Sequence, residues 1–275
     1  MSNIKIVADS SADLTELSGV SFAQASLQIV TDTKTYVDTG DLDVADMVNT
    51  LYKYSGKSST SCPNIGDWLA AFGDAEEIFC LTITSGLSGS YNSAVAAKSK
   101  YEEEHPGRRV EVIDSLSAGP EIALIAQKIR DMITEGLDFD TIAKEIRGYK
   151  TELLFVLESM KNLANNGRVS KLAATVAGVL GIRAIGKASE VGTLEMITKC
   201  RGSSKAVDAL AENMGTLGYR GGKVRICHCL NPELAEQLAA AIKAQFADAA
   251  IEIAECRGLC SFYAERGGML IGFET

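Results

Sequence analysis

The stretch LTITSGLSGSYNS, residues 81–93, predicts a strand that leads through a tight turn into a helix. The apolar run 78–83 supplies the strand, and residues 91–98 combine good helix formers with apolar positions at helical spacing. We expect Ser88 to be the N-cap of this helix, because a serine hydroxyl accepts a backbone N–H group of the first turn. Gly89 would let a ligand approach the main chain closely. Unpaired N–H groups and the positive end of the helix dipole make such a turn a candidate anion-binding site.

The segments on either side of this stretch alternate between strands and helices as far as residue 157. Strands are expected over residues 4–8, 22–31, 78–83, 110–115 and 153–157, and helices over 44–54, 65–72, 117–135 and 139–147. A hairpin is expected around residues 33–34, and residues 58–64 are expected to form a hydroxyl-rich loop. This alternation is typical of a mostly parallel sheet with helices on both faces.

Hydroxyl groups follow three of the expected strands. The pairs are Asp9-Ser10, Thr84-Ser85 and Asp114-Ser115. In parallel sheets, ligands bind at the carboxyl ends of the strands. The hydroxyl groups are therefore expected on the side of the sheet where a ligand would sit.

The pattern changes near residue 158, after which it is typical of an α+β domain with a mixed sheet. Two strands are expected within residues 184–200, joined near Gly192, and further strands over 224–228, 250–254 and 269–273. Helices are expected over 159–164 and 172–180, from about 203 to 217, and over 232–246. We place an amino-terminal α/β domain at residues 1–155 and a carboxy-terminal α+β domain at residues 156–275, with the boundary between 150 and 158.

The composition limits the partners that this chain can have. It has 275 residues with a net charge of −9, which argues against nucleic acid or an anionic membrane surface as the main partner. No apolar run is long enough to cross a bilayer, so we expect no integral membrane association. Seven cysteines and a first segment without an apolar signal sequence favour the reducing cytoplasm.

Several short motifs, in order along the whole chain, resemble the DegV family of bacterial fatty-acid-binding proteins. The resemblance is carried by Asp9-Ser10-Ser11-Ala12-Asp13-Leu14, Thr60-Ser61-Cys62-Pro63-Asn64, Thr84-Ser85-Gly86-Leu87-Ser88-Gly89-Ser90-Tyr91, Val112-Ile113-Asp114-Ser115, Asn166-Gly167-Arg168-Val169-Ser170 and Lys199-Cys200-Arg201-Gly202. Each motif is short, but six in the family's order and with similar spacing make a strong signal.

The resemblance implies a protein that holds one long-chain fatty acid in a tunnel between two domains and is not itself an enzyme. It also implies that a separate fatty acid kinase converts the presented fatty acid to an acyl phosphate. Thr60 and Ser88 would bind the carboxylate, with Ser61 and Gly89 in the same loops and Arg168 at the mouth. No cofactor beyond this ligand is expected.

The chain departs from the family pattern near its end. Many members have His-x-Gly-Pro-Gly where this chain has Tyr263-Ala264-Glu265-Arg266-Gly267. A phenol can donate a hydrogen bond to a carboxylate, but it carries no positive charge near neutral pH. We therefore place Tyr263 in the ligand site and expect the kinase interaction to be the property most affected by the change.

A fatty acid is physically compatible with this sequence. Burial of one CH₂ group contributes roughly 0.8 kcal/mol, so about 15 such groups give on the order of 12 kcal/mol before the costs of ordering. The tail would supply the affinity. The carboxylate would fix the position of the fatty acid along the tunnel, since a buried carboxylate must lie next to hydrogen-bond donors. The small residues of 173–180 leave room to line an acyl slot.

Two other functions remain open from the sequence. A serine hydrolase could use Ser88, although Ser90 replaces the second glycine of the G-x-S-x-G motif and neither histidine is an obvious base. A zinc-stabilised interaction module could use Cys227, Cys229, Cys256 and Cys260, although the first pair lacks the usual two-residue gap. Buried thiols are the simpler interpretation of these cysteines.

Overall fold

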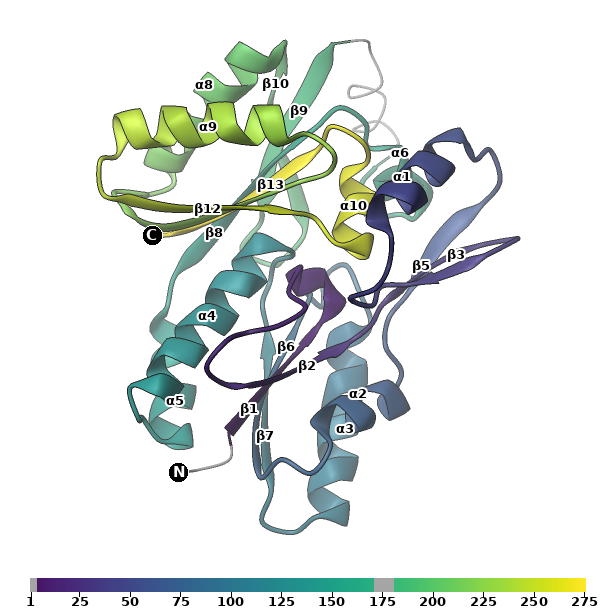
Figure 1. The fold of residues 1–275 in the computed structure, drawn as a ribbon, viewed down its shortest axis with the longest axis vertical. Coiled ribbons are helices and arrows are strands. Elements are labelled where there is room, and N and C mark those ends of the chain that lie inside the picture. Colours follow the sequence, from purple (N-terminus) through teal and green to yellow (C-terminus); the bar gives the residue numbers. More distant parts are fainter. Residues whose placement is uncertain (1–3, 171–180) are drawn as a thin grey trace.

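The computed structural model describes residues 4–170 and 181–275 and contains three sheets (Figure 1). The first sheet has the order β2-β1-β6-β7, and all of its neighbouring strands are parallel. Its strands are β1 (Ile4–Asp9), β2 (Ser21–Ala25), β6 (Glu77–Thr82) and β7 (Arg109–Asp114). The expected mostly parallel amino-terminal sheet is confirmed.

Helices cover both faces of this sheet because its strands are apolar on both sides. Ile6 and Phe79 face a core with α4 (Pro120–Thr134) and α5 (Phe139–Glu145). Val7 and Cys80 face the opposite core, with α2 (Ile65–Phe72) and α3 (Ser90–Glu104). Helix α4 begins at Pro120 and not at residue 117 as expected; a proline is well suited to the first helical position, where its missing N–H group has no partner to lose.

A small antiparallel sheet with the order β4-β3-β5 corrects two expectations. Its strands are β3 (Gln28–Thr31), β4 (Thr35–Val37) and β5 (Ser58–Ser61), and helix α1 (Val44–Lys53) lies between β4 and β5 in the sequence. The single strand expected over 22–31 is two strands in different sheets, β2 and β3. Residues 58–61 form a strand and not a loop, since β3 supplies hydrogen-bonding partners that the local sequence does not reveal. The hairpin around residues 33–34 is confirmed by the pairing of β3 with β4.

The third sheet has six strands in the order β10-β9-β8-β13-β11-β12 and is mixed, as expected. Its strands are β8 (Thr151–Leu157), β9 (Ile182–Ala188), β10 (Leu194–Arg201), β11 (Gly222–His228), β12 (Ala249–Glu255) and β13 (Met269–Glu274). Helices α8 (Ser203–Thr216) and α9 (Pro232–Gln245) contribute Leu210 and Leu238 to the core on one face.

Strand β8 does not belong to the amino-terminal sheet, in which it was expected. It pairs antiparallel with β9 and β13. The division of the chain at residue 155 remains a prediction, and it would fall inside this strand.

Two helices join the amino-terminal and carboxy-terminal parts. Helix α4 packs against β1 and β6 on one side and against β8, β11 and β13 on the other. Helix α10 (Gly258–Ala264), which the sequence analysis did not predict, contacts α1, β3 and the short helix α6 (Lys161–Asn165).

Short 3-10 turns occupy η1 (Ser10–Ala12) and η2 (Ile146–Gly148). The helix expected over 172–180 lies outside the described residues. Within the described residues, no helix has both the length and the apolar character needed to cross a bilayer.

Candidate functional site

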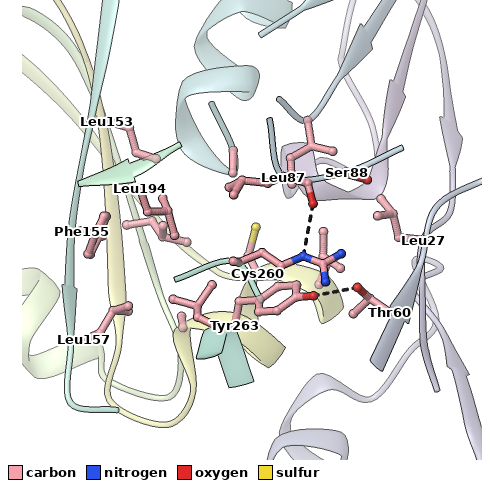
Figure 2. Close-up of a pocket in the computed structure, with 17 residues that line it drawn as sticks. Leu27, Thr60, Leu87, Ser88, Leu153, Phe155, Leu157, Leu194, Cys260 and Tyr263 are labelled. Atoms are coloured by element: carbon pink, nitrogen blue, oxygen red, sulfur yellow. Dashed lines mark hydrogen bonds between the residues drawn. The ribbon is translucent and has the colours of Figure 1, made fainter. Parts of the chain in front are cut away.

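A cavity lies between the two larger sheets, and both parts of the chain line it (Figure 2). Apolar side chains form most of its wall, among them Leu27, Ile83, Leu153, Phe155, Leu157 and Leu194. Polar groups come from Thr60, Ser88, Arg168 and Tyr263. In Figure 2, Thr60 and Ser88 lie on one side of the cavity, and Leu153, Phe155, Leu157 and Leu194 lie on the other. The cavity therefore has a polar end and an apolar body.

Ser88 lies in the turn between β6 and α3, two residues before the helix begins. The N-cap position belongs to Gly89 and not to Ser88, which corrects the expected boundary. The Ser88 hydroxyl still accepts the backbone N–H of Ser90, the first helical residue, at 3.2 Å. Because this contact uses the oxygen only as an acceptor, the hydroxyl proton remains available to a ligand in the cavity.

Two carboxylates, at the ends of the two strands that flank β6, hold the turn in place. Asp9, at the end of β1, accepts the Ile83 N–H at 2.9 Å and the Ser90 hydroxyl at 2.6 Å. Asp114, at the end of β7, accepts the Ser85 N–H at 3.1 Å. Asp9 is fully buried, and burial raises the pKa of its carboxyl while these hydrogen bonds lower it. The strand ends thus meet on one side of the sheet, as the sequence predicts, and they fix the loop that carries Ser88.

Thr60 and Tyr263 form a hydrogen-bonded pair at the polar end of the cavity. Their hydroxyl oxygens are 2.7 Å apart, although 203 residues separate them in the sequence. Thr60 comes from β5 and Tyr263 from α10. Burial raises the pKa of the Tyr263 phenol, whereas Thr60 and the charge of Arg168 lower it. The phenol is therefore neutral near pH 7, and the pair as a whole retains one O–H group for a further acceptor.

Arg168 follows a turn in which Gly167 adopts a φ of 75°. Its Nε donates to the backbone oxygen of Leu87 at 3.2 Å, and its Nη1 donates to the backbone oxygen of Asn166. The guanidinium group is thus attached to the same turn as Ser88. A positive charge in this position would favour an anionic group in the polar end of the cavity.

The structure brings four of the six expected site residues to the cavity and places the other two elsewhere. Ser61 is exposed and follows Thr60 on β5, so alternation along the strand directs it away from the cavity. Gly89 packs next to Cys62, whose Sγ would lie 3.4 Å from a Cβ atom at position 89. Neither Ser61 nor Gly89 is among the described residues that line this cavity. The segment 173–180, expected to line an acyl slot, lies outside the described residues.

Several lining residues were not anticipated. Leu27, Phe155 and Leu194 are ordinary apolar residues in strands or strand ends, and nothing in their local sequence distinguishes a cavity wall from a packed core. Cys260 lines the cavity from α10, a helix that sequence reasoning missed. Only knowledge of which strands face one another would have identified these residues.

A serine hydrolase is not supported by this geometry. The chain has only two histidines. His105 follows the carboxyl end of α3, roughly 20 Å from its start at 1.5 Å per residue, and packs against Tyr101. The Nδ1 atom of His228 lies 3.4 Å from the backbone nitrogen of Asn231. Neither imidazole lines the cavity, so neither histidine is placed to act as a general base for Ser88.

The zinc alternative is not supported either. Cys227, Cys256 and Cys260 share a small buried cluster, while Cys229 belongs to a different core. Across residues 4–170 and 181–275, no three potential ligands are grouped so that they could hold a metal ion. Burial raises the pKa of these thiols, which keeps them protonated, whereas a metal ligand must be a thiolate.

Comparisons with known proteins agree over the full length. A family model described as "Uncharacterised protein, DegV family" matches residues 3–275. A DegV domain-containing protein of Streptococcus pneumoniae (strain ATCC BAA-255 / R6) is 45% identical over 276 residues, with 98% of both chains covered.

Two solved structures with bound ligands are also similar. A DegV family protein from Eubacterium eligens loaded with heptadecanoic acid is 48% identical, with a TM-score of 0.97 and 99% of each chain covered. The Fatty Acid Kinase (Fak) B3 protein of Streptococcus pneumoniae loaded with linoleic acid is 44% identical, with a TM-score of 0.97, 100% of this chain and 99% of that chain covered.

Proposed function

The chain belongs to the DegV family, and from this membership we propose that it binds one long-chain fatty acid in the cavity between its two larger sheets. A single observation carries this function: the cavity combines hydroxyl groups and an arginine at one end with an apolar body lined by the six-stranded sheet and by residues that follow strands of the amino-terminal part. An amphiphile with one anionic head and a long apolar tail matches that division. The similar proteins from Eubacterium eligens and Streptococcus pneumoniae hold molecules of this kind.

The carboxylate is assigned to the polar end. Ser88 would donate its hydroxyl proton, and the Thr60–Tyr263 pair would donate one more. Arg168 would supply the compensating charge from the loop after α6, where it is hydrogen-bonded to the turn that carries Ser88. Charge-assisted hydrogen bonds of this kind offset the cost of removing a carboxylate from water.

The tail is assigned to the apolar body. Leu153, Phe155 and Leu157 lie on β8, and Leu194 lies on β10 in the same sheet. At roughly 0.8 kcal/mol for each buried CH₂ group, the tail supplies most of the affinity. The head group then determines the register of the acid in the cavity.

We further assign the protein the role of a fatty-acid carrier in the cytoplasm that presents its ligand to a fatty acid kinase. The kinase would phosphorylate the carboxylate, and the carrier itself would perform no chemistry. This role is supported by the similarity to the Fak B3 protein. Tyr263 would take the place of the histidine that many family members carry.

Mass spectrometry of lipid extracted from the natively purified protein tests the binding function. We expect one fatty acid per chain and saturable binding of an added fluorescent fatty acid. Absence of both would overturn the proposal. Incubation of the loaded protein with ATP and a bacterial fatty acid kinase tests the second role, and an acyl phosphate should form only when all three components are present.

A further inference from the structure

Asp38 is a buried carboxylate that accepts hydrogen bonds from the start of helix α10, although the two are far apart in the sequence. Its Oδ1 accepts the Gly258 N–H at 2.8 Å, and its Oδ2 accepts the Leu259 N–H at 2.8 Å. Only 1% of Asp38 is exposed. Within α10 itself, no side chain caps these N–H groups. Asp38 therefore makes the amino-terminal cap that the local sequence of α10 lacks.

The approach of Asp38 to α10 depends on a glycine. A Cβ atom at position 258 would lie 2.6 Å from Asp38 Oδ1 and 2.7 Å from Leu42 Cδ2. Both distances are shorter than a side chain permits, so any larger residue at 258 would push α10 away from Asp38. The hydrogen bonds of Asp38 to α10 therefore require glycine at position 258.

Asp38 also belongs to the framework that carries Thr60. It follows β4 directly, and its backbone N–H donates to the Leu27 oxygen at 2.9 Å, next to β3. Strand β3 pairs with β4 on one side and with β5 on the other, where Ile29 stands opposite Thr60. The carboxylate thus connects the small sheet that carries Thr60 to the helix that carries Tyr263. Figure 1 shows α10 lying next to α1 and close to the small sheet.

We propose that Asp38 is a positioning residue for the fatty-acid site, which it serves by holding α10 against the small sheet so that the Tyr263 phenol meets the Thr60 hydroxyl. The inference rests on the proposed function and adds a residue that does not line the cavity. Asp38 acts through Tyr263, which lies five positions after Gly258 in α10. A displacement at the start of the helix would move the Tyr263 phenol away from the Thr60 hydroxyl, to which its oxygen lies at 2.7 Å.

The hydrogen-bonded pair explains why this placement would matter for a ligand. If the phenol donates to Thr60, the threonine proton is free for the carboxylate; if Thr60 donates, the phenol proton is free. In both arrangements one directed O–H group faces the head, and both require the two oxygens to stay in contact. A purely structural cap would stabilise the protein without any link to Tyr263.

A double-mutant cycle separates these two roles. Fatty-acid affinity and thermal stability are measured for the wild type, Asp38→Asn, Tyr263→Phe and the double variant, well below the unfolding temperatures. We expect Asp38→Asn to weaken fatty-acid binding about fivefold in the wild type, the effect of one hydrogen bond. In the Tyr263→Phe background it should weaken binding less than about twofold. The loss of thermal stability should be the same in both backgrounds.

Two further variants keep the test decisive. Gly258→Ala should reproduce the binding pattern of Asp38→Asn, and it replaces that variant if the latter does not fold. Leu238→Ala, in the buried core of α9, is the matched control and should lower stability without changing affinity. Equal losses of affinity with and without the phenol would overturn the positioning role. A wild-type protein that binds no fatty acid would instead refute the proposed function, so the two failures are distinct.

Discussion

The guanidinium group of Arg168 is hydrogen-bonded to the backbone oxygen of Leu87, with 3.2 Å between Nε and that oxygen. Leu87 precedes Ser88, so the only arginine that lines the cavity within the described residues is fixed to the turn that offers a hydroxyl group. The contact joins a loop after α6 to a loop after β6, across the boundary between the two larger sheets. The fold therefore places a positive charge and a hydroxyl proton at the same end of the cavity.

Arg168→Ala should weaken the binding of a fatty acid about tenfold while leaving the binding of the fatty alcohol of equal length nearly unchanged. The reason is that the guanidinium compensates a charge that only the acid carries; a charged hydrogen bond contributes about 1.5–3 kcal/mol. Competition against a fluorescent fatty acid gives both affinities. Arg147→Ala is the control, because Arg147 forms a surface ion pair with Glu111 and its side chain is 72% exposed. Equal losses for acid and alcohol would contradict the assignment.

Ser88→Ala should also reduce fatty-acid affinity, by about 1–3 kcal/mol, because a buried carboxylate oxygen loses a donor. The variant should still fold, but its thermal unfolding temperature should fall somewhat, because Ser90 is buried and its N–H loses the Ser88 oxygen as acceptor. Ser85→Ala is the matched control: Ser85 lies in the same turn but is exposed. Unchanged affinity of the Ser88 variant, with titrations under the same conditions, would remove Ser88 from the head-group site.

The amino-terminal sheet was accessible from the sequence because its strands are short apolar runs ended by polar turns. The same reasoning failed where pairing decides the structure. Residues 58–61 are Ser-Ser-Thr-Ser, which has no apolar periodicity, and they are a strand only because β3 lies alongside. Strand β8 has the composition of a parallel strand, but its paired residues are 27 to 123 positions away in the chain. Local patterns carry no information about such partners.

The site was also only partly predictable, because local motifs identify residues but not their three-dimensional neighbours. Ser88, Thr60 and Arg168 lie in recognisable motifs, and the cavity does bring them together with Tyr263. The motifs did not reveal that neighbouring residues diverge: Thr60 points to the cavity and Ser61 does not, because β5 is a strand and not a loop. The contact between Thr60 and Tyr263 required α10, whose seven residues are too few for a helical period to emerge.

Leu194→Trp should shorten the acyl slot. Leu194 lines the apolar side of the cavity from β10 and is half-buried, so a larger side chain can be accommodated with little loss of stability. For a series of saturated fatty acids, the affinity of the wild type should rise with each added CH₂ group, and the affinity of the variant should stop rising at a shorter chain. Met196→Trp, on the same strand at a position that is 37% exposed, should behave like the wild type. A parallel loss at every chain length would mean that the tail does not reach Leu194.

Asp13 should make the stability of the protein depend on pH in a direction opposite to that of most carboxylates. The pKa of its carboxyl is raised to about 7: burial and the nearby charge of Asp38 raise it, and they outweigh the Arg257 N–H and the charge of Arg225, which lower it. Its Oδ2 is buried without a hydrogen-bond partner among the described residues. The folded state therefore holds a proton between pH 4 and pH 7 that the unfolded chain, with a pKa of about 3.9, has released.

Because the folded state binds the extra proton, this group favours folding fully below about pH 4, and its contribution falls as the pH rises towards 7. A shift of about three pKa units corresponds to roughly 4 kcal/mol. In Asp13→Asn, the amide resembles the protonated acid at every pH and can still accept the Arg257 N–H, which lies 2.8 Å from Oδ1. Urea unfolding of both proteins at pH 4.5, 6 and 7.5 gives the difference in unfolding free energy. We expect the Asn variant to gain stability relative to the wild type as the pH rises; a difference that is constant with pH would place the Asp13 pKa near its ordinary value.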